Sequence, residues 1–164
     1  MQQSAEVCHS HGRAVRPSAD PSLEGLSHDQ ELWEQILAYD LSDVTKAFCD
    51  RNTKYGVNAK KLEVECKRFL YLATIAMNLD MAPTKPIDEY WHQFILFTEE
   101  YERFCDRFAG CFMHHRPFVG PDHEMIFKRT QRLATQIFGS FEEIDWWLMP
   151  MPATSCGRMV PRVS

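Results

Sequence analysis

Residues able to bind a metal ion recur in the middle of the chain at spacings that can bring them together. Asp88 and His92 lie four residues apart in a segment with a helical pattern, so their side chains leave one face, one turn apart. The pair His114-His115 follows after one further helical segment. Two histidines and one carboxylate, with coordination positions left open, form a recognised ligand set for non-haem Fe(II). The sequence therefore predicts catalytic and metal-binding roles for Asp88, His92 and His114, with His115 as the alternative to His114.

Other interpretations of the same residues remain open. Cys105 is a candidate thiolate ligand, although its spacing from neighbouring aromatic residues also suits a buried structural thiol. A closed zinc site would combine His92, Cys105 and His114 with Cys111 as the fourth ligand. Without a metal, Asp88 and His92 would form an acid–base pair in which the carboxylate fixes the imidazole tautomer.

Two further residues are candidates for holding a cofactor or substrate. Tyr101 is expected, with Tyr90 as the alternative, to line a small and partly apolar pocket around the metal. Arg116 follows the histidine pair and suits a bidentate contact to a substrate carboxylate. Cys66 lies inside the apolar stripe of the longest predicted helix and is expected to be a small buried residue.

Length and composition narrow the class of protein. A chain of 164 residues suggests one domain, and a net charge of −5 argues against non-specific nucleic-acid binding. No apolar run approaches the ~20 residues of a membrane span, and the N-terminus lacks the pattern of a secretory signal. Six cysteines without a CxxC pair indicate reduced thiols and a cytoplasmic location. HExxH, GxSxG, phosphate-loop and paired Glu-x-x-His motifs are absent, so the zincin, α/β-hydrolase, P-loop and ferritin-like di-iron classes lack support.

Apolar periodicity predicts an all-α fold, a single-domain bundle of about six helices. Residues 1–25 are polar and predicted to form a flexible arm, residues 26–148 the helical domain, and residues 149–164 a loose tail. The segment Cys111 to Pro121 carries two prolines and the paired histidines and is expected to be an ordered loop. Nowhere does a period-2 run predict a strand. Helix starts are expected at Ser27, Ser42, Asn58, Thr84, Thr98 and Asp122, with a short last helix from Ser140 to Trp147. Gly56 is expected to end the second of these helices, and Gly110 the helix that starts at Thr98.

The central motif supports a family resemblance. The run Ile-Asp-Glu-Tyr-Trp-His over residues 87–92, then Tyr101, Cys105 and the His-His-x-Pro-Phe-x-Gly run over residues 114–120, resembles small bacterial members of the glycine-rich-domain-containing-protein-like family. The resemblance covers roughly residues 38 to 139. It implies a polar site formed by Asp88, His92, Cys105 and His114.

The chain departs from that family's pattern at two positions. Ala109 stands where the family usually has Phe, and Cys111 where an aromatic residue is more usual. Larger plant members tend to carry an acidic residue where His114 stands. Because both residue types bind metals, this comparison favours His114 over His115.

Together these features predict a small metal-dependent enzyme of oxidative type. Its expected cofactor is Fe(II), with Zn(II) as the alternative, and its substrate is a small molecule or peptide of unknown identity. The alternative function is a non-enzymatic interaction module that binds a protein partner and whose His/Cys cluster is structural or holds zinc.

Overall fold

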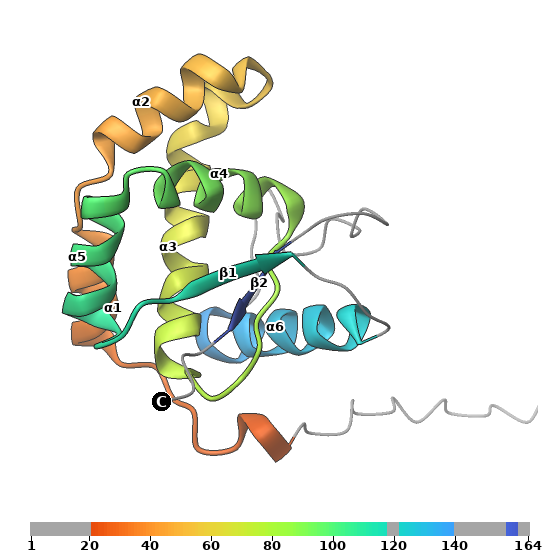
Figure 1. Ribbon diagram of the computed structural model, residues 1–164. Helices are drawn as coiled ribbons and strands as arrows, with labels where there is room; N and C mark the ends of the chain where they lie inside the picture. Colours follow the sequence, from red (N-terminus) through yellow and green to blue (C-terminus); the bar gives the residue numbers. More distant parts are fainter. Residues whose placement is uncertain (1–20, 118–121, 140–156, 161–164) are drawn as a thin grey trace, which may run out of the picture.

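The computed structural model describes residues 21–117, 122–139 and 157–160, and these residues are mostly helical. The predicted all-α fold is confirmed (Figure 1). No helix in these ranges is both long and apolar enough to cross a membrane. In chain order the elements are η1 (Pro21–Leu23), α1 (Gln30–Leu37), α2 (Ser42–Arg51), η2 (Thr53–Asn58), α3 (Ala59–Ile75), α4 (Lys85–Ile95), α5 (Thr98–Phe108), β1 (His114–Pro117), α6 (His123–Phe138) and β2 (Gly157–Val160).

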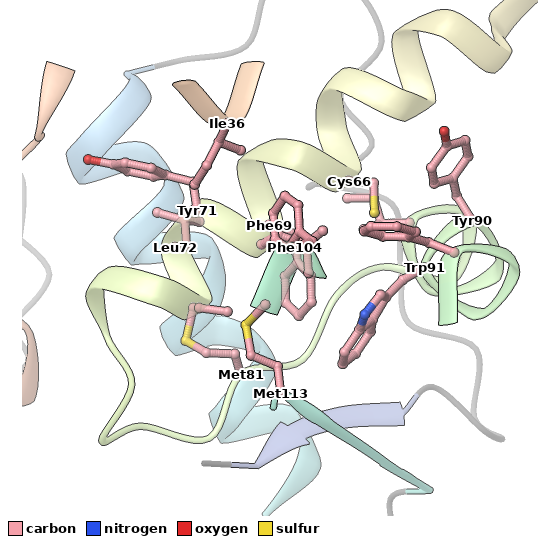
Figure 2. Packing of buried hydrophobic residues seen from close by; sticks show 14 of the residues in the cluster. Ile36, Cys66, Phe69, Tyr71, Leu72, Met81, Tyr90, Trp91, Phe104 and Met113 are labelled. Atoms are coloured by element: carbon pink, nitrogen blue, oxygen red, sulfur yellow. The ribbon is translucent and has the colours of Figure 1, made fainter. Parts of the chain in front are cut away.

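The longest helix, α3, is the centre of the fold. It packs against α1, α2, α4 and α6, and in Figure 1 it runs through the middle of the molecule. The five consecutive residues from Phe69 to Ala73 are all fully buried, which is the pattern of a helix covered on every side. Phe69 meets Trp91 of α4 with ring centroids 5.2 Å apart, close to Phe104 of α5 (Figure 2). The core therefore fixes α4, which carries two of the predicted ligands, Asp88 and His92.

Several predicted helix boundaries need correction. Asp29, not Ser27, caps α1, because its carboxylate accepts a hydrogen bond of 3.0 Å from the backbone N–H of Leu32. Thr98 is the first residue of α5 and not its cap. The second helix ends at Arg51, and the residues after it form the 3-10 helix η2. Ser and Asp are both common N-cap residues, and the hydrogen bond of the Asp29 side chain identifies which of the two caps α1.

The ordered domain begins earlier than the sequence predicted. Residues 21–25, assigned there to the flexible arm, lie in and just after η1, and Leu23 is only 5% exposed. Gln136 of α6 donates a hydrogen bond of 2.9 Å to the carbonyl of Leu26. Packing against α6, more than 100 residues away, holds this segment in place. The rest of the predicted arm, residues 1–20, lies outside the described residues.

A short antiparallel sheet stands where the sequence predicted a loop and a loose tail. His114–Pro117 forms β1, which pairs with Gly157–Val160 as β2, His115 opposite Met159. Neither segment alternates between apolar and polar residues, and the two lie about 40 positions apart, so no local signal predicts the pairing. The helix predicted over residues 140–147 lies outside the described residues.

Gly110 ends α5 as predicted, in a left-handed conformation with φ of 66°. A Cβ at this position would meet nothing within 4 Å, so the cost of Gly110→Ala is conformational and not steric. We expect this variant to lower the free energy of unfolding by about 1–2 kcal/mol, measured by urea denaturation. Gly56→Ala is the matched control, since Gly56 is equally unobstructed but lacks a positive φ. Equal stabilities of the two variants would contradict the assignment.

Candidate metal centre

Helix α4 places Asp88 and His92 on one face, as their spacing predicted. Thr84 precedes the helix, and its carbonyl accepts a hydrogen bond of 2.9 Å from the N–H of Asp88. Asp88 thus lies in the first turn, where the helix dipole favours a carboxylate. The Asp88 side chain is only 4% exposed, whereas that of His92 is 51% exposed. The pair therefore spans the boundary between the core and the solvent.

Strand β1 supplies the third member of the site, His115. Its Nε2 lies 2.9 Å from Oδ1 of Asp88, and Nδ1 of His92 lies 3.5 Å from Oδ2 of the same carboxylate. The two imidazole rings have centroids 4.1 Å apart. One ligand atom from each of the three residues lies within 4.8 Å of the other two. The side chains of Asp88, His92 and His115, called the triad below, converge on a common point.

The spacing of the triad suits a metal ion. Two ligand atoms each about 2.1 Å from an ion, and at right angles to each other, lie about 3.0 Å apart. The distances from Asp88 to His115 and His92, 2.9 and 3.5 Å, bracket that value. Without an ion, a proton on His115 Nε2 can occupy the same place and hydrogen-bond to Asp88. The arrangement therefore accepts either a proton or a cation between its members.

His114, the first choice of the sequence analysis, does not belong to the triad. Successive side chains of a strand point to opposite faces, so β1 can direct only one of the two adjacent histidines towards α4. The ring of His114 instead packs against Phe112, with centroids 5.1 Å apart. His115, which the sequence analysis gave as the alternative, is the histidine that meets Asp88.

No cysteine belongs to this group, which is the only such cluster of histidine, cysteine and carboxylate ligands within residues 21–117 and 122–139. Cys105 is fully buried; burial raises the pKa of its thiol, while a hydrogen bond from the Met113 backbone opposes that rise. Cys66 is also fully buried, as predicted, and burial raises its pKa. The closed zinc set of His92, Cys105, His114 and Cys111 is therefore not assembled.

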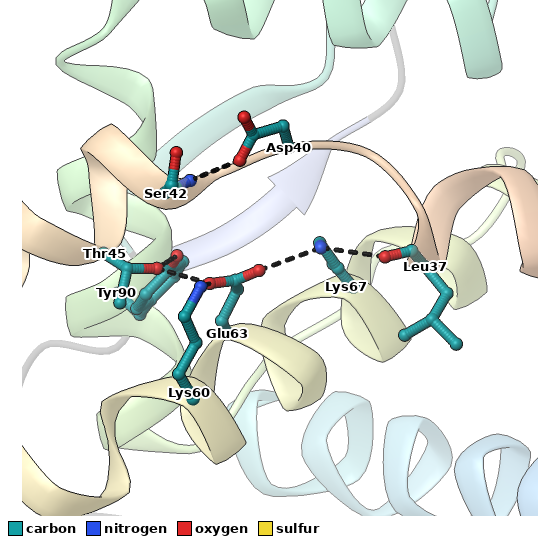
Figure 3. Close-up of polar contacts among 8 residues, drawn as sticks. All are labelled: Leu37, Asp40, Ser42, Thr45, Lys60, Glu63, Lys67 and Tyr90. Carbon is teal, nitrogen blue, oxygen red and sulfur yellow. Dashed lines mark hydrogen bonds and ion pairs between the residues drawn. The ribbon is translucent and has the colours of Figure 1, made fainter.

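Neither Tyr101 nor Arg116, the two residues predicted to bind a cofactor or substrate, belongs to the triad. Tyr101 is fully buried, and its hydroxyl is engaged by other protein groups. Arg116 follows His115 in β1, so its exposed side chain leaves the opposite face of the strand. The Tyr90 hydroxyl lies 2.7 Å from that of Thr45 in α2 (Figure 3). Because Tyr90 follows Asp88 by two residues in α4, the two side chains leave the helix on opposite sides.

Burial lowers the pKa of His92, an effect that Asp88 opposes and His115 reinforces. A lower pKa favours the neutral imidazole, which is the form that binds metals.

His123 at the start of α6 is a further histidine near the site, one that the sequence did not predict. Burial lowers its pKa too, and Asp88 opposes this shift, so His123 lies within electrostatic reach of the triad. His123 is the first residue of α6, more than 30 positions after Asp88, and no local signal in the sequence brings the two together.

A separate cleft of about 470 Å³ lies where the chain enters α2 and α5. None of its lining residues belongs to the triad, so it is not the expected pocket around the metal. Its acidic side chains are partly engaged, because Glu100 accepts a hydrogen bond from Tyr39 and pairs with Arg103 at 2.7 Å. The lining consists of Asp40, Leu41, Ser42, Asp43, Val44, Phe97, Thr98, Glu99, Glu100 and Arg103.

Comparison with known families gives one match. Residues 36–145, most of the chain, match the model of a family described as UCP032817-like, and this segment contains the whole triad. No curated protein and no solved structure matches the chain. The description of this family names no activity. The resemblance to the glycine-rich-domain-containing-protein-like family is not tested by this match and stays a prediction.

Proposed function

The chain belongs to the UCP032817-like family, and we propose that it is a small metal-dependent enzyme in which the triad holds one Fe(II) ion for oxidative chemistry. The observation that carries this proposal is the convergence of Asp88, His92 and His115, whose ligand atoms lie within 4.8 Å of one another. Two imidazoles and one carboxylate match the facial ligand set of non-haem Fe(II) oxygenases.

The unequal exposure of the triad favours an open site over a closed structural one. The side chains of Asp88 and His115 are 4% and 12% exposed, whereas that of His92 is 51% exposed. Three protein ligands leave positions for other molecules, and those positions would face the solvent beside His92. Bound Fe(II) would supply binding positions for dioxygen and a substrate there. The chain supplies the ligand geometry and, through the buried ring of Trp91 against His115, an apolar wall.

The second candidate is a protein-interaction module without catalysis. It is favoured by the hydrogen bond between His115 and Asp88, which joins β1 to α4 without any metal. In that case the buried carboxylate would have a structural role, and the partner would be another protein. The purified protein would then contain zinc or no metal.

Anaerobic reconstitution with Fe(II) distinguishes the two functions. For untagged protein we expect about one iron per chain by elemental analysis, together with oxygen consumption once a suitable substrate is present. Cys111→Ser is the control variant, because Cys111 lies outside the triad, and it should bind the same amount of iron. Stoichiometric zinc that is lost in Cys105→Ser and Cys111→Ser would contradict the iron proposal and support the interaction module.

A further inference from the structure

Three elements of the site meet at the hydroxyl of Tyr101 in α5. The indole Nε1–H of Trp91 donates a hydrogen bond of 3.1 Å to this hydroxyl, which itself donates one of 2.7 Å to the carbonyl of Met113. Trp91 directly precedes His92 in α4, and Met113 lies two residues before His115. The hydroxyl therefore connects the helix that carries two triad residues to the strand that carries the third.

We propose that Tyr101 is a positioning residue for the metal site, one that holds His115 at the correct distance from Asp88 without touching the metal. This inference rests on the proposed function, because it concerns the same triad. It also replaces the cofactor-binding role that the sequence suggested for Tyr101. Since the hydroxyl bonds Trp91 and Met113, it acts on the site through these two neighbours.

The surroundings of His115 show why this connection matters. The ring of Trp91 lies edge-on to that of His115, with centroids 4.7 Å apart and planes at 63°. The Tyr101 hydroxyl bonds the indole N–H of Trp91 and the carbonyl of Met113, the residue directly before β1, so two of the contacts that position His115 depend on this one hydroxyl. The short strand β1 has its only sheet partner in β2, within the described residues. Ligand positions must be held to within about 0.5 Å, which calls for such support.

The residues that form this connection are shielded from solvent. Trp91 and Tyr101 are fully buried, and Met113 is 2% exposed (Figure 2 shows Trp91 and Met113 in the core). Burial raises the pKa of Tyr101, so the phenol keeps the proton that it donates to Met113. Removal of the hydroxyl would leave a buried N–H and a buried carbonyl without this partner, and the strand would be free to move.

The test compares Tyr101→Phe with Tyr90→Phe. Tyr90 is an equally buried tyrosine whose hydroxyl bonds Thr45 in α2 and has no contact with β1. In metal-free protein, the side-chain ¹H–¹⁵N spectrum of His115 should lose its hydrogen-bonded Nε2 signal in Tyr101→Phe and keep it in Tyr90→Phe. The dissociation constant for Fe(II) alone, measured anaerobically, should rise about 10- to 100-fold in Tyr101→Phe only, the usual range for residues that orient metal ligands.

An unchanged His115 spectrum in Tyr101→Phe would overturn the inference, as would equal effects of the two variants. If the wild-type protein binds no Fe(II), the proposed function fails, and the metal-free spectra still decide the role of Tyr101. If Tyr101→Phe does not fold, the same measurements can be made on Trp91→Phe, which removes one of the two hydrogen bonds of the Tyr101 hydroxyl. It should also displace the His115 signal, and an unchanged signal would count against the inference.

Discussion

Replacing His115 with alanine should weaken Fe(II) binding by more than about 100-fold, because losing a ligand costs more than losing a residue that only orients one. Asp88→Ala should have at least the same effect, since its carboxylate contacts both imidazoles, at 2.9 and 3.5 Å. The measurement is an anaerobic Fe(II) titration of each variant. The sequence alone predicted a larger loss of Fe(II) affinity for His114→Ala than for His115→Ala, and the structure predicts the opposite order.

His114→Ala is the matched control for this experiment. It removes the same side chain from the neighbouring position of the same strand, but from the face opposite to Asp88. Its Fe(II) affinity should stay close to that of the wild type, with a small loss of stability from the contact with Phe112. Retained binding in His115→Ala, or lost binding in His114→Ala, would contradict the assignment of the triad.

Glu63→Ala should cost about 3–5 kcal/mol of unfolding free energy, the range for breaking a buried ion pair from one side. Glu63 and Lys67 are 6% and 4% exposed, and their charged groups lie 2.9 Å apart (Figure 3). Without Glu63, the buried Lys67 ammonium would keep only the carbonyl of Leu37, at 3.0 Å, among its present partners. Urea denaturation at neutral pH measures the loss.

Lys60→Ala tests the same carboxylate from its exposed side. The Lys60 side chain is 72% exposed, so its removal should cost no more than about 1 kcal/mol. If Glu63→Ala also lost less than about 1 kcal/mol of unfolding free energy, the Lys67 ammonium would have to be hydrated in that variant, and the prediction from its burial would be wrong.

The contribution of Glu63 should also depend on pH. Burial acts to raise its pKa, but hydrogen bonds from Thr45, Lys60 and Lys67 lower it overall. The stabilisation is therefore full above the ordinary pKa of 4.5 and is lost as the pH falls through the lower value of the folded state. The difference between wild type and Glu63→Ala should shrink over that interval.

The sequence by itself determined what depends on neighbours within a turn or two of helix. Apolar residues spaced by three and four predicted α3 and α4, and the spacing of Asp88 and His92 placed both on one face. Gly110 was expected to end α5, and its positive φ explains why glycine stands there. These features follow from local backbone geometry, which acts over about four residues.

Only the tertiary structure decided which histidine meets Asp88. That choice depends on the register of β1, and the register is set by β2, about 40 residues further along the chain. A shift of one residue in a strand exchanges its two faces, so His114 and His115 cannot be distinguished without knowledge of the partner. The role of Tyr101 was hidden for the same reason. An aromatic residue at helical spacing predicts burial, but the partners of its hydroxyl depend on how α4, α5 and β1 pack together.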